Sequence, residues 1–288
     1  MSFIELIDIG KSFGPRDVLR GVNLAVEEGE FVSVVGASAS GKTTLMKIAS
    51  GLLAADKGAV RMDGKPLSGF SHDASIVFQN YSLLPWLSAL ENVRLAVEAA
   101  FPGKAKAQHT EHAERYLKMV GLGAAISKRP SQLSGGMRQR VAIARAFAVE
   151  PRVLFLDEPF GALDALTRAT LQQELATMCS AASRPVTALM ITNSVDEAIL
   201  LSDRILALGR GPGASLSPAV PVEIARPRAA DLLMHNDQAI RIRSRLAEFL
   251  SASHGSGKTV GRAATLNATV NAPLKAGVPA GVTVEARS

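Results

Sequence analysis

The chain has 288 residues, a formal net charge of +6, and 47% hydrophobic against 20% charged residues. This length allows one large or two modest domains with a sizeable buried core. The sequence contains no run of about 18 apolar residues, so it predicts no membrane span. The single cysteine, Cys179, excludes an intramolecular disulfide framework and a cysteine-based zinc site. Because the N-terminal residues also lack the basic and apolar pattern of a signal peptide, we expect a cytoplasmic protein.

The excess of basic residues does not identify a partner. Lys and Arg total 32 against 26 Asp and Glu, and most of them are scattered along the chain. Aromatic residues make up only 5%, too few for the stacked bases of a single-strand-binding protein. We interpret the charge as a solvated surface and expect no nucleic-acid partner.

Residues 1–30 predict an antiparallel pair of strands. Apolar residues alternate with polar ones between 3 and 9 and again between 18 and 26. Gly14-Pro15 lies between the two segments and Glu28-Gly29 follows the second. Both dipeptides are typical of turns, so the two segments are expected to pair as neighbours.

A buried strand, a loop of small residues and a helix follow. Phe31–Val35 predicts the strand, the stretch from Lys42 predicts the helix, and Gly36–Thr43 matches the phosphate-loop spacing G-x-x-x-x-G-K-[ST]. Small residues let backbone N–H groups surround phosphates, and the helix N-terminus adds partial positive charge. Lys42 can reach the β- and γ-phosphates, and the Thr43 hydroxyl can ligate Mg²⁺. The flanking strand and helix make an accidental turn a poor alternative, and the predicted nucleotide-binding residues are Gly36, Ala37, Ser38, Ala39, Ser40, Gly41, Lys42, Thr43 and Thr44.

The middle of the chain predicts further buried strands and a long helical stretch. The strand candidates are Ser75–Phe78, Val153–Asp157, Leu189–Thr192 and Arg204–Leu208. Residues 87–149, between the first two, are mostly helical in pattern, so we predict an α/β core interrupted by a helical insertion. The predicted buried helix faces are Ala113, Leu117 and Val120; Val141, Ala144 and Ala148; Leu171, Leu175 and Met178; and Ile242, Leu246 and Phe249.

The composition changes beyond Leu250. Residues 251–288 are rich in Ala, Gly, Ser, Thr and Val with little periodicity, so we expect most of them to be disordered. They include His254–Thr259, which looks like half of a phosphate loop, but Ala252 stands where the first glycine is needed and no buried strand precedes it. We therefore place the domain at 1–250 and interpret the remainder as a flexible tail.

Two carboxylates close the strand predicted at Val153–Asp157, because Glu158 follows Asp157 directly. In a phosphate-loop enzyme the first carboxylate holds Mg²⁺, directly or through water, and the second polarises an attacking water. Carboxylates at strand ends also serve as helix caps or as solvated groups. The phosphate loop elsewhere in the chain favours the catalytic interpretation.

A second anion-binding motif opens a later helix. In Leu133–Met137, Ser134 is followed by Gly135 and Gly136. A serine and two glycines at a helix start present N–H groups to an anion, although such a string also serves as an ordinary N-cap. Two anion sites in one chain suggest a nucleotide that is shared between two protomers.

The ordered set of motifs resembles the ATP-binding subunits of ABC transporters. The set comprises the phosphate loop, Gln79, Leu133–Met137, Val153–Glu158 and Ala162-Leu163-Asp164, and the resemblance covers residues 3 to 250. It implies a P-loop NTPase core with an antiparallel β subdomain and an inserted helical subdomain at about 87–149, together with ATP and Mg²⁺ as ligands.

Four segments narrow the resemblance within that family. Val77–Trp86 and Glu158–Arg168 look like importers of nitrate, cyanate, sulfonates and taurine. Leu200–Arg204 and the closing helix look most like the nitrate branch. The resemblance therefore implies import of a small anion, namely nitrate or the related nitrite or cyanate, with a sulfonate or taurine as the alternative.

The resemblance also implies roles for single residues. Phe13 would stack on adenine, and Gln79 would sense Mg²⁺ and the γ-phosphate beside the catalytic Glu158. Asp157 would be a metal ligand together with Thr43 and Gln79. Ser134, Gly135 and Gly136 would bind the γ-phosphate held by the opposite protomer, and Asp164 would lie across the dimer interface. A buried core position is the alternative for Phe13.

Tyr81–Trp86 would lie near the groove that receives a helix of a membrane permease, although Trp86 also suits a core. The implied partners are transmembrane permease subunits, a second ATP-binding subunit that is a copy or a relative, and indirectly an external substrate-binding protein. The chain would then be peripheral, at the cytoplasmic face of the inner membrane.

Two positions depart from the family pattern. Ala39 stands where a phosphate-loop glycine is usual, and its Cβ would crowd the nucleotide. Asn193 stands where a catalytic histidine contacts the γ-phosphate; asparagine can donate a hydrogen bond but cannot carry imidazolium charge. Nucleotide binding is therefore a firmer expectation than fast hydrolysis, and a slow regulatory subunit is an alternative. A DNA-maintenance ATPase is disfavoured because no sustained heptad run is present.

Overall fold

The first 66 residues contain an antiparallel sheet with the strand order β2-β1-β4-β5. The computed structural model describes residues 2–181, 185–229 and 232–255. β1 (Ser2–Phe13) and β2 (Arg16–Glu27) pair around the turn at Gly14-Pro15, which confirms the predicted strand pair. β4 (Lys57–Met62) and β5 (Lys65–Pro66) were not predicted. Most β4 side chains are exposed, so the strand lacks the alternation of apolar and polar residues that indicates a half-buried strand.

The second sheet has the order β10-β9-β3-β8-β7-β6 and is parallel except at β10. Its strands are β3 (Phe31–Val35), β6 (Ala74–Val77), β7 (Val153–Asp157), β8 (Thr187–Thr192), β9 (Arg204–Ala207) and β10 (Val220–Pro221). Every residue of β3, β7 and β8 is buried, as expected of parallel strands covered on both faces. The predicted strands are confirmed, with β8 beginning two residues earlier than expected, at Thr187. The carboxyl ends of β3, β7 and β8 meet at one edge, where the loops that follow them gather.

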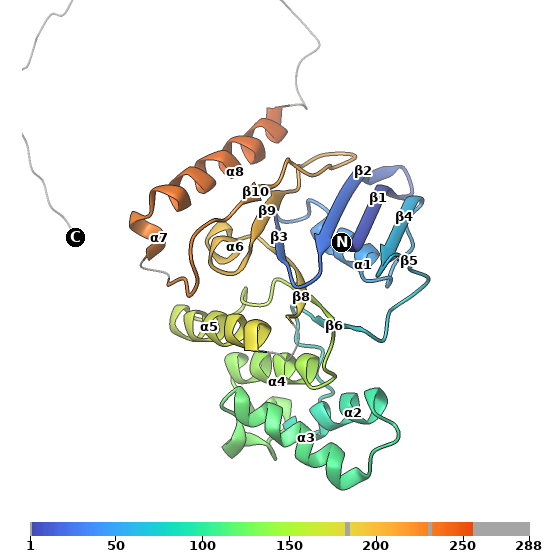
Figure 1. Cartoon of the computed structure of the whole chain (residues 1–288), viewed down its shortest axis with the longest axis vertical. Helices are drawn as coiled ribbons and strands as arrows, with labels where there is room; N and C mark the ends of the chain where they lie inside the picture. Colours follow the sequence, from blue (N-terminus) through green and yellow to red (C-terminus); the bar gives the residue numbers. More distant parts are fainter. Residues whose placement is uncertain (1, 182–184, 230–231, 256–288) are drawn as a thin grey trace, which may run out of the picture. The chain divides into compact units, whose positions relative to one another are not determined.

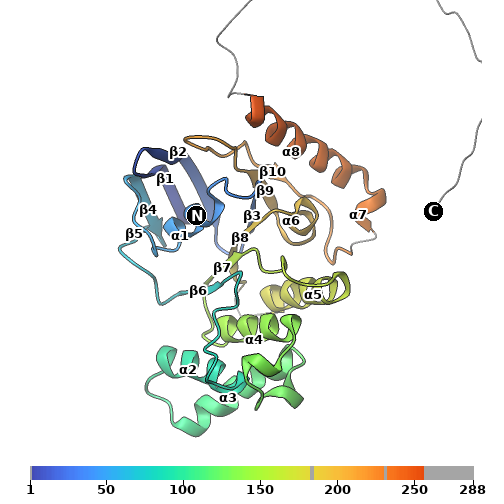
Figure 2. The ribbon, with the colours of Figure 1, turned by 180° about the vertical axis from the view of Figure 1, so that it is seen from behind.

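Helices lie on the parallel sheet and beside it (Figures 1 and 2). α1 (Lys42–Ala49) follows β3, and α2 (Ala89–Ala100), α3 (Lys106–Met119) and α4 (Gly135–Phe147) form a group that touches the sheet through the contact of α4 with β6. Short 3₁₀ turns at Gly123–Ala125 and Pro130–Gln132 join α3 to α4. The remaining helices are α5 (Ala165–Ala181), α6 (Val195–Leu201), α7 (Leu232–His235) and α8 (Asp237–Gly255).

The helix faces predicted from the sequence are buried. Ala113, Leu117 and Val120 pack with Val141, Ala144 and Ala148 in one hydrophobic cluster that also takes in Leu171, Leu175 and Met178. A second cluster places α1 between the two sheets, and a third packs Ile242 and Leu246 of α8 against α6 and β9, with Phe249 partly buried beside them. Among the described residues, no helix combines the length and the apolar character needed to cross a lipid bilayer.

α8 continues to Gly255, five residues beyond the predicted domain end at Leu250. Residues 251–254 contain no glycine or proline, so nothing in the local sequence stops the helix before Gly255. The rest of the predicted tail, residues 256–288, lies outside the described residues, as does most of the half phosphate loop at His254–Thr259.

Candidate functional site

The loop between β3 and α1 has the backbone that the phosphate-loop spacing predicts. Gly41 is the N-cap of α1 with φ +105°, a left-handed conformation that glycine adopts without a steric penalty. At Gly36 an added Cβ would lie 2.9 Å from Ser40 Oγ and 3.0 Å from the carbonyl oxygen of Leu208. Both glycines are therefore required by the fold of the loop itself.

The same loop fits the phosphates of a nucleotide. No side chain caps the N-terminus of α1, so its first N–H groups face the loop without a side-chain acceptor. The Ser40 hydroxyl is buried and has no hydrogen-bond partner among the described residues. A buried orphan hydroxyl beside free helix N–H groups is the arrangement that phosphate oxygens satisfy.

Lys42 projects from α1 back across the loop. Its side chain is 3% exposed, and its Nζ donates to the carbonyl oxygens of Gly36 (3.0 Å) and Ala37 (2.9 Å) and to Asn193 Oδ1 (2.8 Å). Burial lowers the pKa of Lys42, and the nearby Glu158 and Asp157 carboxylates oppose that shift. A buried cation held only by neutral oxygens and one carboxylate at 3.9 Å gains when phosphate charge replaces them.

The first carboxylate at the end of β7 lies beside α1. Asp157 is buried, and the Thr43 hydroxyl donates to its Oδ1 at 3.3 Å. Burial raises the pKa of Asp157, the Thr43 bond lowers it, and the neighbouring Glu158 raises it. A hydroxyl and a carboxylate at the phosphate loop are the hard oxygen ligands that suit Mg²⁺ together with phosphate oxygens, so the residues present fit this ion.

The second carboxylate is held by two amide side chains. Asn193 Nδ2 donates to Glu158 Oε1 at 2.7 Å, and Gln79 Nε2 donates to Glu158 Oε2 at 3.3 Å. Glu158 itself has φ +43°, while its backbone N–H donates to the carbonyl oxygen of Ile191 at 2.9 Å. A glutamate in the left-handed backbone conformation is strained, and strained residues of this kind cluster at functional sites.

We call the group Lys42, Thr43, Gln79, Asp157, Glu158 and Asn193 the carboxylate cluster. Asn193 connects Lys42 to Glu158 in this cluster, because Asn193 Oδ1 accepts from Lys42 and Asn193 Nδ2 donates to Glu158. A neutral amide suits both roles at once, whereas an imidazolium could only donate. The hydrogen bonds of Asn193 to Glu158 and to Lys42 thus join residues that are 35 and 151 positions apart in the sequence.

Ala39 adopts φ +61°, so the position is left-handed as well as lacking the usual glycine. A left-handed backbone costs an L-residue roughly 1–2 kcal/mol relative to the right-handed form. Thr44, five residues later, is half-buried in the first turn of α1. Crowding of a nucleotide by the Ala39 Cβ stays a prediction.

The Ser134 motif is separate from the carboxylate cluster: no hydrogen bond or ion pair joins the two within the part of the chain that the structure describes. Ser134 is the N-cap of α4, and its Oγ accepts from the N–H of Met137 at 3.2 Å. At Gly136 an added Cβ would lie 2.5 Å from Thr167 Cγ2 of α5. The packing of α4 on α5 alone therefore requires this glycine.

We expect Gly136→Ala to lower the free energy of unfolding by about 1–3 kcal/mol, as overpacking typically does. In a Thr167→Ser background, which lacks the opposing methyl group, the same change should be close to neutral, because alanine has the better helix propensity by about 1 kcal/mol. Urea unfolding of the four proteins of this double-mutant cycle measures the coupling. Equal losses in both backgrounds would show that Thr167 is not the obstacle.

The structure shows the hydrogen bond of Asp164 and the exposure of Phe13 and Trp86, which the sequence did not determine. Asp164 Oδ1 accepts from the N–H of Thr167 at 3.0 Å at the start of α5, and this bond holds the pKa of Asp164 below its ordinary value. Phe13 is 51% exposed at the end of β1, so the core alternative for it is excluded. Trp86 is 63% exposed, which excludes its core alternative as well.

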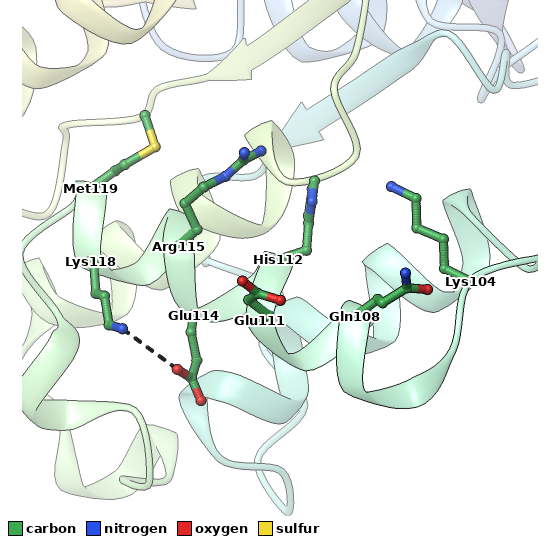
Figure 3. Close-up of a pocket in the computed structure, with 8 residues that line it drawn as sticks. All are labelled: Lys104, Gln108, Glu111, His112, Glu114, Arg115, Lys118 and Met119. Carbon is green, nitrogen blue, oxygen red and sulfur yellow. Dashed lines mark ion pairs between the residues drawn. The ribbon is translucent and has the colours of Figure 1, made fainter.

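A surface pocket of about 750 Å³ lies elsewhere, along α3 (Figure 3). Its lining includes His112, Arg115 and Met119, and an ion pair joins Lys118 Nζ to Glu114 Oε2 at 3.6 Å. None of the predicted site residues lines it. Its lining mixes positive and negative side chains, whereas the phosphate loop combines Lys42 with helix N–H groups that no side chain caps.

Residues that the sequence analysis missed support the predicted site residues. Thr192 Oγ1 donates to the buried Glu197 at 2.6 Å and accepts from the N–H of Ser194 at 3.0 Å, which shapes the turn that carries Asn193. The spacing Ser194-x-x-Glu197 is a helix-start signal that could have revealed α6. Arg145, which contacts the loop after Gln79, has no local signal of this kind.

Comparison with known proteins identifies the chain's relatives. The family described as ABC transporter matches residues 19–161. The nitrate import ATP-binding protein NrtD of Synechococcus elongatus is 44% identical over 86% of this chain and 91% of its own length. The bicarbonate transport ATP-binding protein CmpC of Synechocystis sp. is 44% identical over 86% of this chain, which spans only 38% of CmpC.

Solved structures agree with this relationship and with the expected fold. The dimeric post-hydrolysis state of the ATP-binding cassette MJ0796, bound to ADP and Pi, has a TM-score of 0.68 at 31% identity, over 77% of this chain and 100% of that chain. A second dimeric structure of MJ0796, described as a bacterial ABC transporter cassette, has a TM-score of 0.70 at 32% identity, with the same coverage. The P-loop core with its antiparallel β subdomain and helical insertion is thus confirmed. The chain belongs to the ATP-binding proteins of the ABC transporter family, the ABC ATPases.

Proposed function

We propose that this protein binds and hydrolyses ATP to power an importer of a small anion, nitrate in the first place. The observation that carries the proposal is the position of Glu158. Gln79 and Asn193 hold its two carboxylate oxygens, and its Oε1 lies 3.9 Å from Nζ of the phosphate-loop lysine. A strained, amide-held carboxylate beside a phosphate loop suits activation of a water molecule at a γ-phosphate.

The residues of the loop bind the nucleotide in this proposal. The N–H groups of 36–44 and the orphan Ser40 hydroxyl donate to phosphate oxygens, and Lys42 exchanges its carbonyl partners for them. Thr43, Asp157 and Gln79 would hold Mg²⁺, which would neutralise charge on the phosphates. Phe13, exposed beside Lys11, provides a ring face for adenine.

Glu158 acts as the base that orients and polarises water. A glutamate carboxylate without such partners would rotate freely in solvent, but the side-chain amides of Gln79 and Asn193 donate to both oxygens of Glu158 and fix their orientation. Fixed orientation lowers the entropic part of the barrier, and proton acceptance by a positioned base contributes about 10²–10⁴-fold.

Each site is completed by a second subunit in this proposal. Ser134, Gly135 and Gly136 present the start of α4 to the γ-phosphate held by the partner, and Asp164 lies at the interface. The separation of the Ser134 motif from the carboxylate cluster supports this arrangement, as does the dimeric state of the MJ0796 structures. The partner is a copy of this chain or a related subunit.

The exposed loop with Tyr81–Trp86 docks on the permease. Trp86 is 63% exposed and Pro85 is also exposed, so an apolar surface is available to a permease helix. Such docking places the protein at the cytoplasmic face of the inner membrane, with an external substrate-binding protein acting on the other side of the permease.

The anion is proposed from the chain's relatives. NrtD is named for nitrate and CmpC for bicarbonate, and both are 44% identical to this chain. Coverage does not separate the two anions, because NrtD is matched over 91% of its length and the bicarbonate transport ATP-binding protein CmpD of Synechocystis sp. over 89%. Nitrate is placed first because Leu200–Arg204 and the closing helix resemble the nitrate branch. Bicarbonate is the second candidate, and a sulfonate or taurine is the third.

Uptake by the host strain tests the anion. In a strain that lacks this chain, labelled nitrate, bicarbonate and taurine are supplied separately at low concentration, with and without restored expression. We expect restoration to increase nitrate uptake alone, and a Glu158→Gln chain to fail to do so. Restored uptake of bicarbonate or taurine instead would replace nitrate with that substrate.

Asn193 allows a prediction on the rate of hydrolysis. We expect Asn193→Ala to lower the rate by about 10²-fold, because Glu158 loses its shorter hydrogen bond and a preorganised donor is typically worth 10²–10³. We expect Asn193→His to raise the rate. In the proposed ATP complex Lys42 donates to phosphate oxygens, so position 193 is free to donate, and a histidine there can carry charge toward the γ-phosphate. Initial phosphate release at saturating Mg·ATP measures both.

An equal or lower rate for Asn193→His would show that asparagine is no handicap, and the slow regulatory subunit would then lose its support. Asn236→His makes the same substitution away from the carboxylate cluster and is the control for the introduced histidine. Because the Asn236 side chain caps α8 by accepting from the N–H of Ala239 at 3.0 Å, the fold of this variant is verified by circular dichroism before its rate is compared. ATP affinity should stay nearly unchanged in all these variants.

A further inference from the structure

The loop that follows Gln79 has an unusual backbone. Tyr81 and Ser82 both lie in the left-handed region, with φ +64° and +47°. The N–H of Tyr81 donates to the carbonyl oxygen of Phe78 at 3.1 Å, and that of Ser82 donates to Asn80 at 2.7 Å. Consecutive non-glycine residues rarely adopt this conformation, so the surroundings must impose it.

Arg145 of α4 supplies the contact that imposes it. Its Nη1 donates to the carbonyl oxygen of Ser82 at 2.6 Å, and its Nη2 donates to that of Tyr81 at 2.9 Å. Burial lowers the pKa of Arg145. The planar guanidinium fork fixes the direction of two successive carbonyl groups at once, which a flexible ammonium cannot do.

The same helix contacts the Tyr81 side chain. The guanidinium of Arg138 lies 5.5 Å from the centre of the Tyr81 ring, and an added Cβ at Gly135 would lie 3.4 Å from the Tyr81 hydroxyl. α4 begins directly after Ser134. The Ser134 motif and the loop that follows Gln79 are therefore attached to one helix.

The far end of the loop is attached to the helical group as well. The buried side chain of Asn92 in α2 accepts from the N–H of Leu84 at 2.8 Å and donates to the carbonyl oxygen of Ser88 at 2.9 Å. Exposed Trp86 lies between these anchors. The loop from Tyr81 to Ser88 is therefore held by side chains of α2 and α4.

We propose that Arg145 is a positioning residue for hydrolysis: it sets the location of Gln79 against Glu158 and makes that location depend on the position of α4. Gln79 lies two residues before the clamped carbonyl of Tyr81, and its amide contacts Glu158 at 3.3 Å. This inference rests on the proposed ATP hydrolysis.

The test is Arg145→Met in the full chain, which keeps the apolar stem and removes both donors. We expect kcat for ATP hydrolysis to fall by 10- to 100-fold, because misplacement of a catalytic group by about 1 Å costs up to 10²-fold. The KM for ATP should change less than about twofold, because the phosphate loop is untouched. The Mg²⁺ concentration for the half-maximal rate should rise, because Gln79 is displaced.

Two further variants separate positioning from general damage. Arg145→Lys can donate to one carbonyl at a time and should recover part of kcat and of the Mg²⁺ dependence. Arg94→Met on α2, which breaks only the ion pair with Glu98, is the matched control and should behave like the parent. Should Arg145→Met fail to fold, Arg145→Lys carries the test alone.

An unchanged kcat and Mg²⁺ dependence in Arg145→Met, or in Arg145→Lys where only that variant folds, would overturn the inference and leave the proposed hydrolysis intact. A higher KM at unchanged kcat would also overturn it, because that result assigns Arg145 to nucleotide binding. A parent chain that hydrolyses no ATP, alone or with its partners, would overturn the proposed function and the inference together.

Discussion

Replacing Glu158 with glutamine is expected to lower the rate of ATP hydrolysis by about 10²–10⁴-fold while ATP binding is retained. Glutamine keeps the shape of the side chain, and its oxygen can still accept from Asn193, the shorter of the two bonds to Glu158. Its amide group cannot accept a proton from water, so the closed dimer should persist. Single-turnover hydrolysis and size-exclusion chromatography with Mg·ATP measure the two effects.

Glu111→Gln is the control for this variant, because Glu111 is an exposed glutamate on α3 that lines the pocket of Figure 3. It should hydrolyse ATP at the parental rate and form no persistent dimer. Parental hydrolysis by Glu158→Gln would assign the base to another residue, and Asp157 would then be the first to examine.

Lys42→Ala should weaken ATP binding by about two orders of magnitude and abolish nucleotide-dependent dimer formation. Hydrogen bonds to charged groups contribute about 1.5–3 kcal/mol each, and Lys42 is the buried cation at the loop. Removing it also leaves Asn193 Oδ1 and two loop carbonyls without their donor. Titration with a fluorescent ATP analogue and size-exclusion chromatography measure the loss.

Lys47→Ala removes an exposed lysine from the last turn of the same helix and serves as the control. It should bind ATP within about threefold of the parent, because a cation at an exposed helix end contributes about 0.3–1 kcal/mol. Undiminished affinity in Lys42→Ala, with its fold verified by circular dichroism, would refute the assignment of the phosphate site.

Local patterns in the sequence were sufficient for the phosphate loop and the parallel strands. The spacing from Gly36 to Thr43 constrains residues that are neighbours in the chain, and the structure gives the loop the expected left-handed glycine at Gly41. Buried strands such as Val153–Asp157 are short apolar runs between turns, which is the strongest signal for a parallel sheet. β4 gave no such signal because it is mostly exposed.

Helix ends and side-chain exposure were less predictable. The change in composition at Leu250 suggested an end, yet the small residues that follow allow α8 to continue to Gly255. Phe13 and Trp86 had core alternatives that apolar character alone could not exclude. Whether a large apolar side chain is buried depends on which elements pack over it, and no element among the described residues covers these two.

The sequence by itself determined the fold class, the phosphate loop and the pair of carboxylates at the end of β7, because each depends on residues that are close together in the chain. Only the tertiary structure decided that Asn193 links Lys42 to Glu158, that Thr167 excludes a side chain at Gly136, and that Arg145 clamps the loop after Gln79. These contacts join residues 31 to 151 positions apart. Such contacts arise from the packing of whole helices and strands, and a hydrophobic pattern records which face of an element is buried but not what lies against it.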